Sequence, residues 1–238
     1  MTLVCKTKTR FLMPSLSSYS ASTYSPCREE MIVLNRSTEE ILAFAIALIP
    51  AFTLHEFAHA WMAWRLGDST AKELGRLTLN PLKHLDVMGT LLVFVVGFGW
   101  AKPVPVNPYN LRGGRKGMAL VAVVGPLSNL ALATAVALLW RASGFVGGDL
   151  VAKVLLVFIY LNLALLFFNL IPFPPLDGFR VLLGVLPESL AQQWARLGQV
   201  GPMLLFGLIL LGNFIPGVDI LGRIVVGPTK ALMRVLLQ

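Results

Sequence analysis

Charged residues are scarce in this chain, and their scarcity limits the class of protein it can be. Asp, Glu, Lys and Arg make up only 13% of the 238 residues, whereas 56% are hydrophobic and the mean hydropathy is +0.73. A soluble domain usually carries about 25% charged residues. The composition therefore excludes an ordinary soluble domain and predicts an all-α membrane protein, a multi-pass helical bundle in the cell membrane.

Cysteine, histidine and basic stripes are also scarce or missing. The two cysteines, Cys5 and Cys27, lie outside the apolar segments and suit neither a cysteine zinc site nor a disulfide framework. Only three histidines are present, which excludes membrane hydroxylases and desaturases because those enzymes need many. No stripe of Lys and Arg interleaved with aromatic residues occurs, so we expect no nucleic-acid partner. The net charge of +8 instead indicates a lipid-facing surface and a fixed topology.

Three regions follow one another along the chain. Residues 1–36 are rich in Ser, Thr and Tyr and contain no apolar run of signal-peptide length. We expect these residues to form a disordered tail, or to lie before the true start of the protein, which would then be Met31. A transit peptide is a third interpretation. Residues 37–218 hold the apolar core. Residues 219–238 carry basic residues at helical spacing and predict an amphipathic C-terminal helix at the membrane interface.

Long apolar stretches predict spanning helices over residues 41–64, 118–140, 154–176 and 197–218. Residues 87–101 are also apolar, but they are fewer than the roughly 20 residues that a spanning helix needs. The loops on both sides of this short stretch are basic, and the positive-inside rule places both in the cytoplasm. They can share one side only if the chain enters the membrane and returns. We therefore predict a re-entrant segment near residues 87–106.

The motif His-Glu-Phe-Ala-His at residues 55–59 lies inside the first apolar stretch. On a helix, His55 and His59 share one face one turn apart, where two imidazoles can bind one Zn²⁺. Glu56 between them can act as the general base that activates water. Ionisable groups at membrane depth are costly, so this motif predicts a functional site. The alternative is that these polar residues are merely buried between packed helices.

A catalytic zinc site needs three protein ligands and one open position. Asp177 is the best third candidate, because the Pro-Pro-Leu-Asp-Gly turn that follows the third apolar stretch fixes the backbone and aims one carboxylate. Its alternative is an ordinary surface β-turn. His84 could ligate instead, but it lies in a polar connector and we expect it to face water. The remaining candidates are Asp86, Asp149 and Glu188.

A second polar motif, Gly-Pro-Leu-Ser-Asn at residues 125–129, lies inside the span predicted at 118–140. Asn129 falls at about the same distance from the cytoplasmic end of its helix as His55 does. Its amide could therefore donate to a substrate carbonyl or to an oxyanion. The alternative is a hydrogen bond between helices that holds the bundle together.

Together these motifs resemble the site-2 protease family of intramembrane zinc metalloproteases. The resemblance is carried by His-Glu-Phe-Ala-His-Ala at 55–60, Gly-Pro-Leu-Ser-Asn at 125–129 and the run Phe-Asn-Leu-Ile-Pro-Phe-Pro-Pro-Leu-Asp-Gly at 168–178. Two further segments, 75–81 and 99–108, are typical of the compact prokaryotic members that have no PDZ domain. The family's usual Asn-Pro-Asp-Gly appears here as Pro-Leu-Asp-Gly, so the Asn of that motif is displaced.

The resemblance implies a zinc cofactor held by His55, His59 and Asp177, with Glu56 as the catalytic base. It also implies that the partner is a transmembrane substrate protein within the lipid bilayer. The basic loops separately predict that the active site lies toward the cytoplasmic face. One rival is a prenyl-protein-processing membrane zinc protease, which would take Glu188 as third ligand. Another is a metal-binding membrane protein without proteolytic activity, such as a transporter or scaffold. Glu56 argues against the latter, because a structural metal site needs no base.

Overall fold

The described part of the chain is helical and contains no strand. A computed structural model describes residues 38–96, 99–143, 148–214 and 220–238, and the predicted tail at 1–36 lies outside them. Within those residues the only β-type pairing is an isolated antiparallel bridge between Leu85 and Ala101. The predicted all-α class is therefore confirmed.

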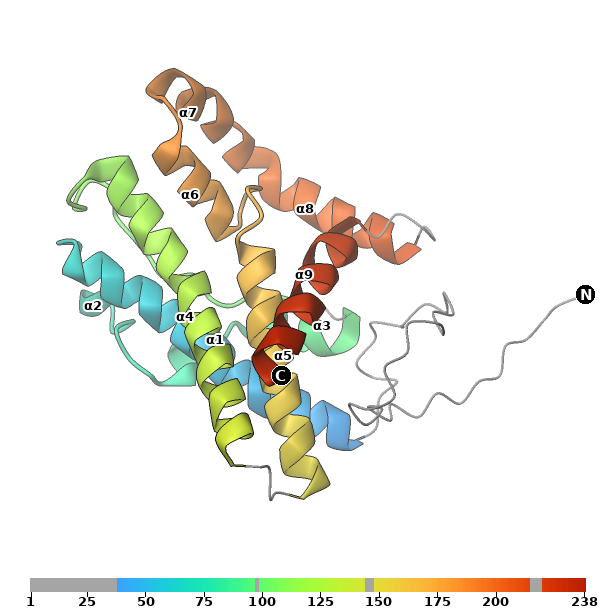
Figure 1. Ribbon diagram of the computed structural model, residues 1–238. Coiled ribbons are helices and arrows are strands. Elements are labelled where there is room, and N and C mark those ends of the chain that lie inside the picture. Colours follow the sequence, from blue (N-terminus) through green and yellow to red (C-terminus); the bar gives the residue numbers. More distant parts are fainter. Residues whose placement is uncertain (1–37, 97–98, 144–147, 215–219) are drawn as a thin grey trace, which may run out of the picture. The chain divides into compact units, whose positions relative to one another are not determined.

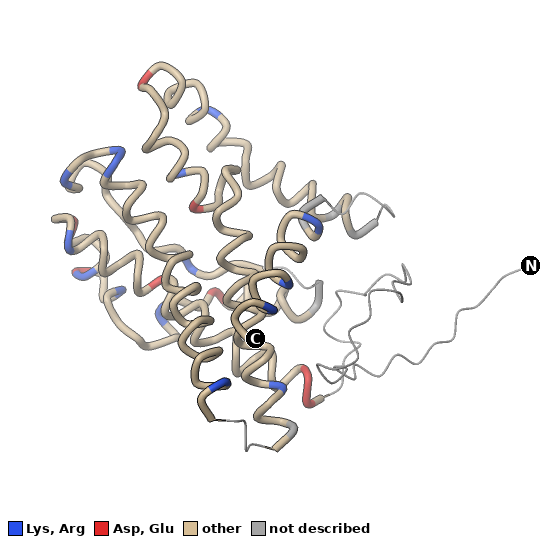
Figure 2. The backbone as a smooth tube through the Cα atoms, viewed as in Figure 1, with Lys and Arg blue, Asp and Glu red and all other residues tan. Residues whose placement is uncertain are grey.

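Three long helices form the body of the bundle: α1 (Thr38–Arg65), α4 (Gly114–Ala142) and α5 (Asp149–Asn169) (Figure 1). By length and apolar composition, all three could cross a membrane. The charged residues of α4 lie only in its first and last turns, and the middle of its tube carries no charge (Figure 2). This distribution fits the predicted multi-pass bundle.

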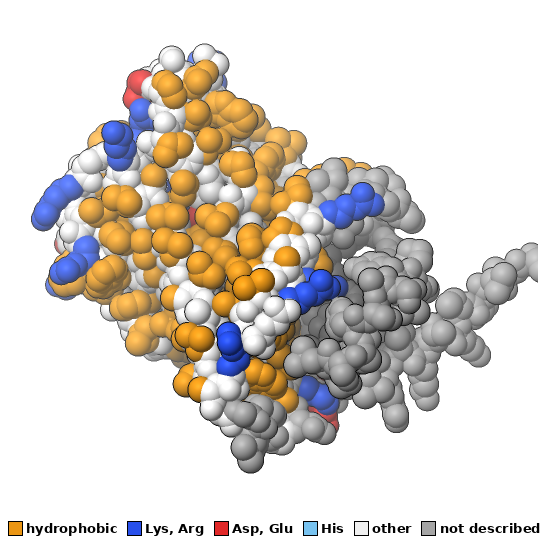
Figure 3. All heavy atoms as spheres, viewed as in Figure 1, with side chains coloured by type: hydrophobic (Ala, Val, Ile, Leu, Met, Phe, Trp, Pro, Cys, Tyr) orange, Lys and Arg blue, Asp and Glu red, His pale blue; other side chains and the backbone are white. Residues whose placement is uncertain are grey.

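Apolar side chains also cover the outside of the bundle. On α4, Leu127, Leu138 and Leu139 are each about half exposed or more. Hydrophobic side chains spread across much of the face seen in Figure 3. A large apolar surface of this kind marks contact with another apolar phase, and on helices of this length a lipid bilayer supplies that phase.

Small residues let the long helices approach one another closely. Ala43, Ala47 and Ala51 of α1 are fully buried, as are Ala133 and Ala137 of α4. Helices in a membrane gain little from the hydrophobic effect when they associate, because lipid is as apolar as their side chains. Close van der Waals contact between small residues stabilises their association instead.

The last helix, α9 (Ile220–Leu237), packs on this bundle with its apolar face. Ala133 and Ala137 join Ile159, Leu163 and Leu166 of α5 in one buried cluster. Leu232, Met233 and Leu236 of α9 pack against that cluster. A helix thus covers Ile220–Leu237 within the region 219–238, while its assignment as an amphipathic helix at the membrane interface remains a prediction.

The polar connector between α1 and α4 is anchored by Asp68. It contains α2 (Thr70–Glu73), the 3-10 turn η3 (Pro81–Lys83) and α3 (Val87–Val96). The fully buried Asp68 carboxylate accepts the backbone N–H groups of Thr70 and Asn107, at 3.1 and 2.7 Å, and the amide of Asn110 at 3.2 Å. Burial alone would raise the pKa of Asp68, but a hydrogen bond from the Thr70 hydroxyl, together with the three above, holds it below its ordinary value.

The segments that precede and follow α3 lie side by side. Besides the bridge between Leu85 and Ala101, the N–H of Lys102 donates to the carbonyl of His84 at 2.7 Å. A Cβ on Gly89, in the first turn of α3, would lie 2.1 Å from the carbonyl oxygen of Trp100. Only glycine permits this close return. The chain path suits a hairpin, and its entry into the membrane remains a prediction.

The third predicted span, residues 154–176, is displaced from the helix that forms. Helix α5 covers Asp149–Asn169, and residues 170–176 make an irregular turn. Pro172, Pro174 and Pro175 lack the N–H that a helix interior needs. The helix therefore ends before the apolar stretch of the sequence does. Asp177 accordingly opens a new helix, α6 (Asp177–Val185), instead of sitting in a surface turn.

Two further helices, α7 (Glu188–Ala195) and α8 (Leu197–Phe214), follow α6. The fourth predicted span, residues 197–218, corresponds to α8. Its apolar described part, Leu197–Ile209, is shorter than the three helices long enough to span, and residues 215–218 lie outside the described part.

Candidate metal centre

His55 and His59 lie one turn apart on α1 and face the interior of the bundle. Their Nε2 atoms are 3.0 Å apart, and the two residues are 6% and 7% exposed. The helical spacing of the motif thus aims both nitrogens at one point, on the side of α1 that contacts α4.

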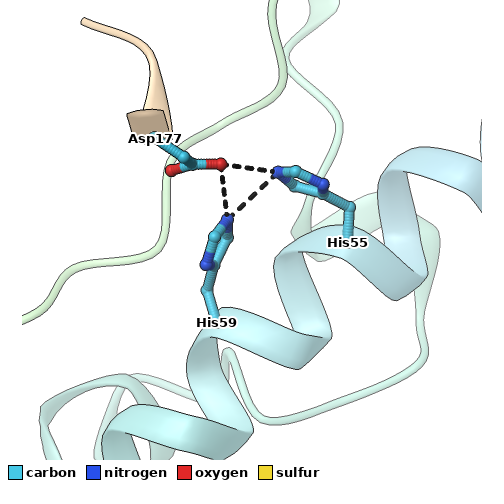
Figure 4. Close-up of side chains that lie close together, drawn as sticks. All are labelled: His55, His59 and Asp177. Carbon is cyan, nitrogen blue, oxygen red and sulfur yellow. Dashed lines mark hydrogen bonds and ion pairs between the residues drawn. The ribbon is translucent and has the colours of Figure 1, made fainter. Parts of the chain in front are cut away.

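Asp177 brings a carboxylate to the same point from α6. Its Oδ2 lies 3.2 Å from Nε2 of His55 and 3.2 Å from Nε2 of His59 (Figure 4). The residue is only 8% exposed. The irregular turn after α5 therefore places the carboxylate of Asp177, which is distant in sequence, against the two histidines of α1.

These three residues fit a zinc ion. Two ligands placed about 2 Å from a tetrahedral ion are separated by roughly 3.3 Å, and the three donor atoms here lie 3.0 to 3.2 Å apart. Two imidazoles and one carboxylate are also a ligand set found in catalytic zinc sites, where a fourth position stays open. Among the described residues, His55, His59 and Asp177 form the one such group of potential ligands.

Glu56 is held beside this group by a separate segment of the chain. Its Oε2 accepts the backbone N–H of Val104 at 3.1 Å, and the residue is 9% exposed. The guanidinium of Arg76 donates to the carbonyls of Lys102 and Pro103, immediately before Val104. Arg76 therefore fixes the backbone that holds the Glu56 carboxylate.

Arg76 was missed as a site residue by the sequence analysis. It is 6% exposed, and burial lowers the pKa of its guanidinium while the charge of Glu56 acts in the opposite direction. An arginine remains charged even so. The only sequence signal was its place in the segment 75–81 that is typical of the resembled subgroup, which carries no information about contacts.

The outer nitrogens of both imidazoles face α4. Nδ1 of His59 lies 2.7 Å from the carbonyl oxygen of Val121, and Nδ1 of His55 lies 3.3 Å from the amide nitrogen of Asn129. A Cβ on Gly125 would lie 2.3 Å from Nε2 of His59, so only glycine allows α4 this close. Helix α4 continues through the motif at 125–129, as the predicted span over 118–140 requires.

The other candidate ligands lie elsewhere. His84 does not face water as expected: it is fully buried and its Nε2 lies 2.7 Å from the carbonyl of Thr78, because the connector folds over it. Glu188, in α7, pairs with Arg115 at 2.8 Å. Asp86 accepts the N–H of Gly89 in the first turn of α3. The side chain of Asp149 lies outside what the structure describes.

Comparison with known proteins agrees with a metal centre set in apolar helices. The chain is 41% identical over 179 residues to "Putative zinc metalloprotease YwhC" of Bacillus subtilis, covering 71% of this chain and 82% of YwhC. It belongs to the zinc metalloprotease family that YwhC represents.

More distant relatives carry the same description. "Putative zinc metalloprotease MJ0611" of Methanocaldococcus jannaschii is 32% identical over 145 residues, or 60% of this chain and 71% of the relative. "Putative zinc metalloprotease Rip2" of Mycolicibacterium smegmatis is 33% identical over 147 residues, or 54% of this chain and 51% of Rip2. No family model and no solved structure matches the chain.

Proposed function

We propose that this protein is an intramembrane zinc metalloendopeptidase of the site-2 protease type, which hydrolyses peptide bonds within transmembrane helices of substrate proteins. One observation carries the proposal: His55, His59 and Asp177 converge inside a bundle of membrane-length apolar helices, with Glu56 beside them. The motif resemblance and the names of the relatives support the same chemistry.

The proposed mechanism assigns separate tasks to ligands and base. His55, His59 and Asp177 would hold the zinc ion. Zinc bound there supplies Lewis acidity, which makes water more acidic and polarises the scissile carbonyl. Glu56 takes the proton from the attacking water and delivers it to the leaving amine nitrogen, so that the peptide C–N bond breaks and both new termini form. Val104 orients the Glu56 carboxylate for this transfer.

The proposed substrate places demands on the site. A transmembrane helix satisfies its backbone hydrogen bonds internally, so it must unwind locally before its peptide bond is accessible. The non-helical run that contains Val104 lies against Glu56, and in this proposal it receives the unwound strand by backbone pairing. Basic loops on the connector side favour an active centre toward the cytoplasmic face of the cell membrane. Regulated intramembrane proteolysis would be the cellular process.

The rival third ligand, Glu188, is weakly supported. Its side chain is 63% exposed and already paired with Arg115. The geometry therefore favours the site-2 protease type over the prenyl-processing type, in which a late glutamate completes the site.

The test is Glu56→Gln. The amide retains an oxygen that can accept from Val104, so the variant should fold and hold as much zinc as the wild type. It should lose cleavage by about 10²-fold or more, because an amide cannot accept the proton. Zinc content and cleavage of a generic transmembrane-helix substrate are measured together, with the exposed Glu73→Gln as the control. Cleavage by Glu56→Gln at the wild-type rate would refute the mechanism. A wild type that binds zinc but cleaves nothing would support the non-proteolytic alternative.

A further inference from the structure

Among the described residues, one face of α4 contacts the outer nitrogens of both histidines. Val121, Gly125 and Asn129 are spaced four residues apart and therefore lie on the same side of the helix. Val121 contacts His59, Asn129 contacts His55, and Gly125 between them leaves room for the rings. Helix α4 thus makes one polar contact to each of the two imidazoles.

The contact at Val121 determines the tautomer of His59. A backbone carbonyl can only accept a hydrogen bond, so at 2.7 Å Nδ1 of His59 must carry the proton. Its Nε2 is then an unprotonated lone pair aimed at Asp177 and His55. A histidine that binds a metal through Nε2 needs this same arrangement, with an acceptor on its other nitrogen.

The contact at Asn129 is different and incomplete. As placed, Nδ2 of Asn129 faces Nδ1 of His55 at 3.3 Å, while Oδ1 of the same amide is buried without a hydrogen-bond partner. With Nδ2 as the donor, Nδ1 of His55 must accept and Nε2 would carry the proton, which prevents ligation. Rotating the amide by half a turn exchanges oxygen and nitrogen in nearly the same space. Oδ1 then accepts from Nδ1–H of His55, and Nε2 becomes available.

We infer that Asn129 is a positioning residue of the metal centre, whose Oδ1 accepts the Nδ1–H of His55 as the Val121 carbonyl accepts that of His59. This inference rests on metal binding at the proposed site, but not on proteolysis. Asn129 has no exposed surface, which favours a contact with His55 over the predicted contact with substrate or oxyanion. Helix α4 thus sets the tautomer and ring orientation of both histidines.

The experiment measures zinc affinity in purified full-length protein by competition with a chelator at fixed pH. Asn129→Leu, similar in size but unable to accept, should weaken zinc binding about 10- to 100-fold. Asn129→Asp should remain within a few-fold of the wild type, because a carboxylate can also accept from Nδ1–H. The control is Asn162→Leu on α5, another fully buried asparagine, which bonds to the carbonyl of Phe158 and should leave zinc affinity unchanged.

A second readout separates this role from general damage to the fold. The visible spectrum of Co²⁺ bound in place of zinc should change for Asn129→Leu and resemble the wild type for Asn129→Asp. Wild-type zinc affinity in Asn129→Leu with a reduced kcat would overturn the inference and return Asn129 to a substrate role. Equal loss in Asn129→Asp and Asn129→Leu would also overturn it. If the affinities follow the expected order but the wild type cleaves no helix, the inference stands and the proposed function fails.

Discussion

The carboxylate of Glu56 accepts a hydrogen bond from the backbone N–H of Val104, although 48 residues separate the two in sequence. Val104 follows two carbonyl groups that Arg76 binds. The proposed base is therefore oriented by a peptide group, and that peptide group is itself held by a buried cation of the connector. Orientation of the base thus depends on residues outside the metal-binding motifs.

The first prediction concerns Arg76. Arg76→Gln is too short to hold both carbonyls, so Val104 should shift and cleavage should fall on the order of 10²-fold, as expected for misplacement by about 1 Å. Zinc content should not change, since Arg76 contacts no proposed ligand. Turnover and zinc content are measured beside Arg112→Gln, an exposed arginine of the same connector. Loss of zinc together with activity would show that Arg76 supports the fold as a whole.

A second prediction concerns Gly125. Alanine is the better helix former by about 1 kcal/mol, so Gly125→Ala would stabilise an isolated helix. Here its Cβ would lie 2.3 Å from Nε2 of His59, and zinc binding should be lost. Gly207→Ala in α8 meets nothing within 4 Å and serves as the matched control. Equal zinc content in the two variants would contradict the described approach of α4 to α1.

The third ligand can be tested by comparing acidic residues. Asp177→Ala should abolish zinc binding and activity, because it removes the oxygen placed 3.2 Å from both imidazoles. Glu188→Ala should leave zinc unchanged. His84→Ala should also keep zinc but lower the thermal stability, since it opens a cavity and leaves the Thr78 carbonyl without its partner. Zinc loss in Glu188→Ala and not in Asp177→Ala would favour the prenyl-processing type.

A fourth prediction concerns topology. If the chain around α3 enters the membrane and returns, both flanking loops face the cytoplasm. Cysteines introduced at Leu82 and Tyr109, which are 80% and 95% exposed, should then react with a membrane-impermeant reagent only from the cytoplasmic side. The background variant has Cys5 and Cys27 replaced by serine. Labelling of the two positions from opposite sides would mean that α3 crosses.

The pH dependence of stability can be predicted for Asp68. Its pKa is lowered in the folded state, so the carboxylate stabilises the fold fully above the unfolded value of about 3.9 and this contribution is lost as pH falls through the folded pKa. Asp68→Asn should unfold more easily at pH 6, and the difference from the wild type should shrink toward pH 3. Thermal unfolding at both pH values measures it. A constant difference would mean that ionisation of Asp68 does not contribute.

The sequence could predict geometry that depends on spacing within one helix, but not contacts between segments that are distant in sequence. The spacing of His55 and His59 determines their common face once a helix forms, so that part of the geometry was predictable. Asp177 was singled out through its proline-rich turn, but its approach to α1 depends on how α6 packs. The contacts of Arg76 and Gly125 exist only after distant segments meet. His84 was misjudged because a polar connector looks exposed in sequence, whereas the folded connector covers it.

The missing Cβ at Gly125 has a consequence for how the centre would respond to its surroundings. Because α4 contacts both imidazoles and even a Cβ on Gly125 would overlap the ring of His59, a sideways displacement of this helix would disturb the two proposed nitrogen ligands together. If the proposed centre holds an ion, its rate of release would therefore depend on how closely α1 and α4 pack. In a bilayer that lets these two helices separate, the proposed centre would exchange its metal faster, even without substrate.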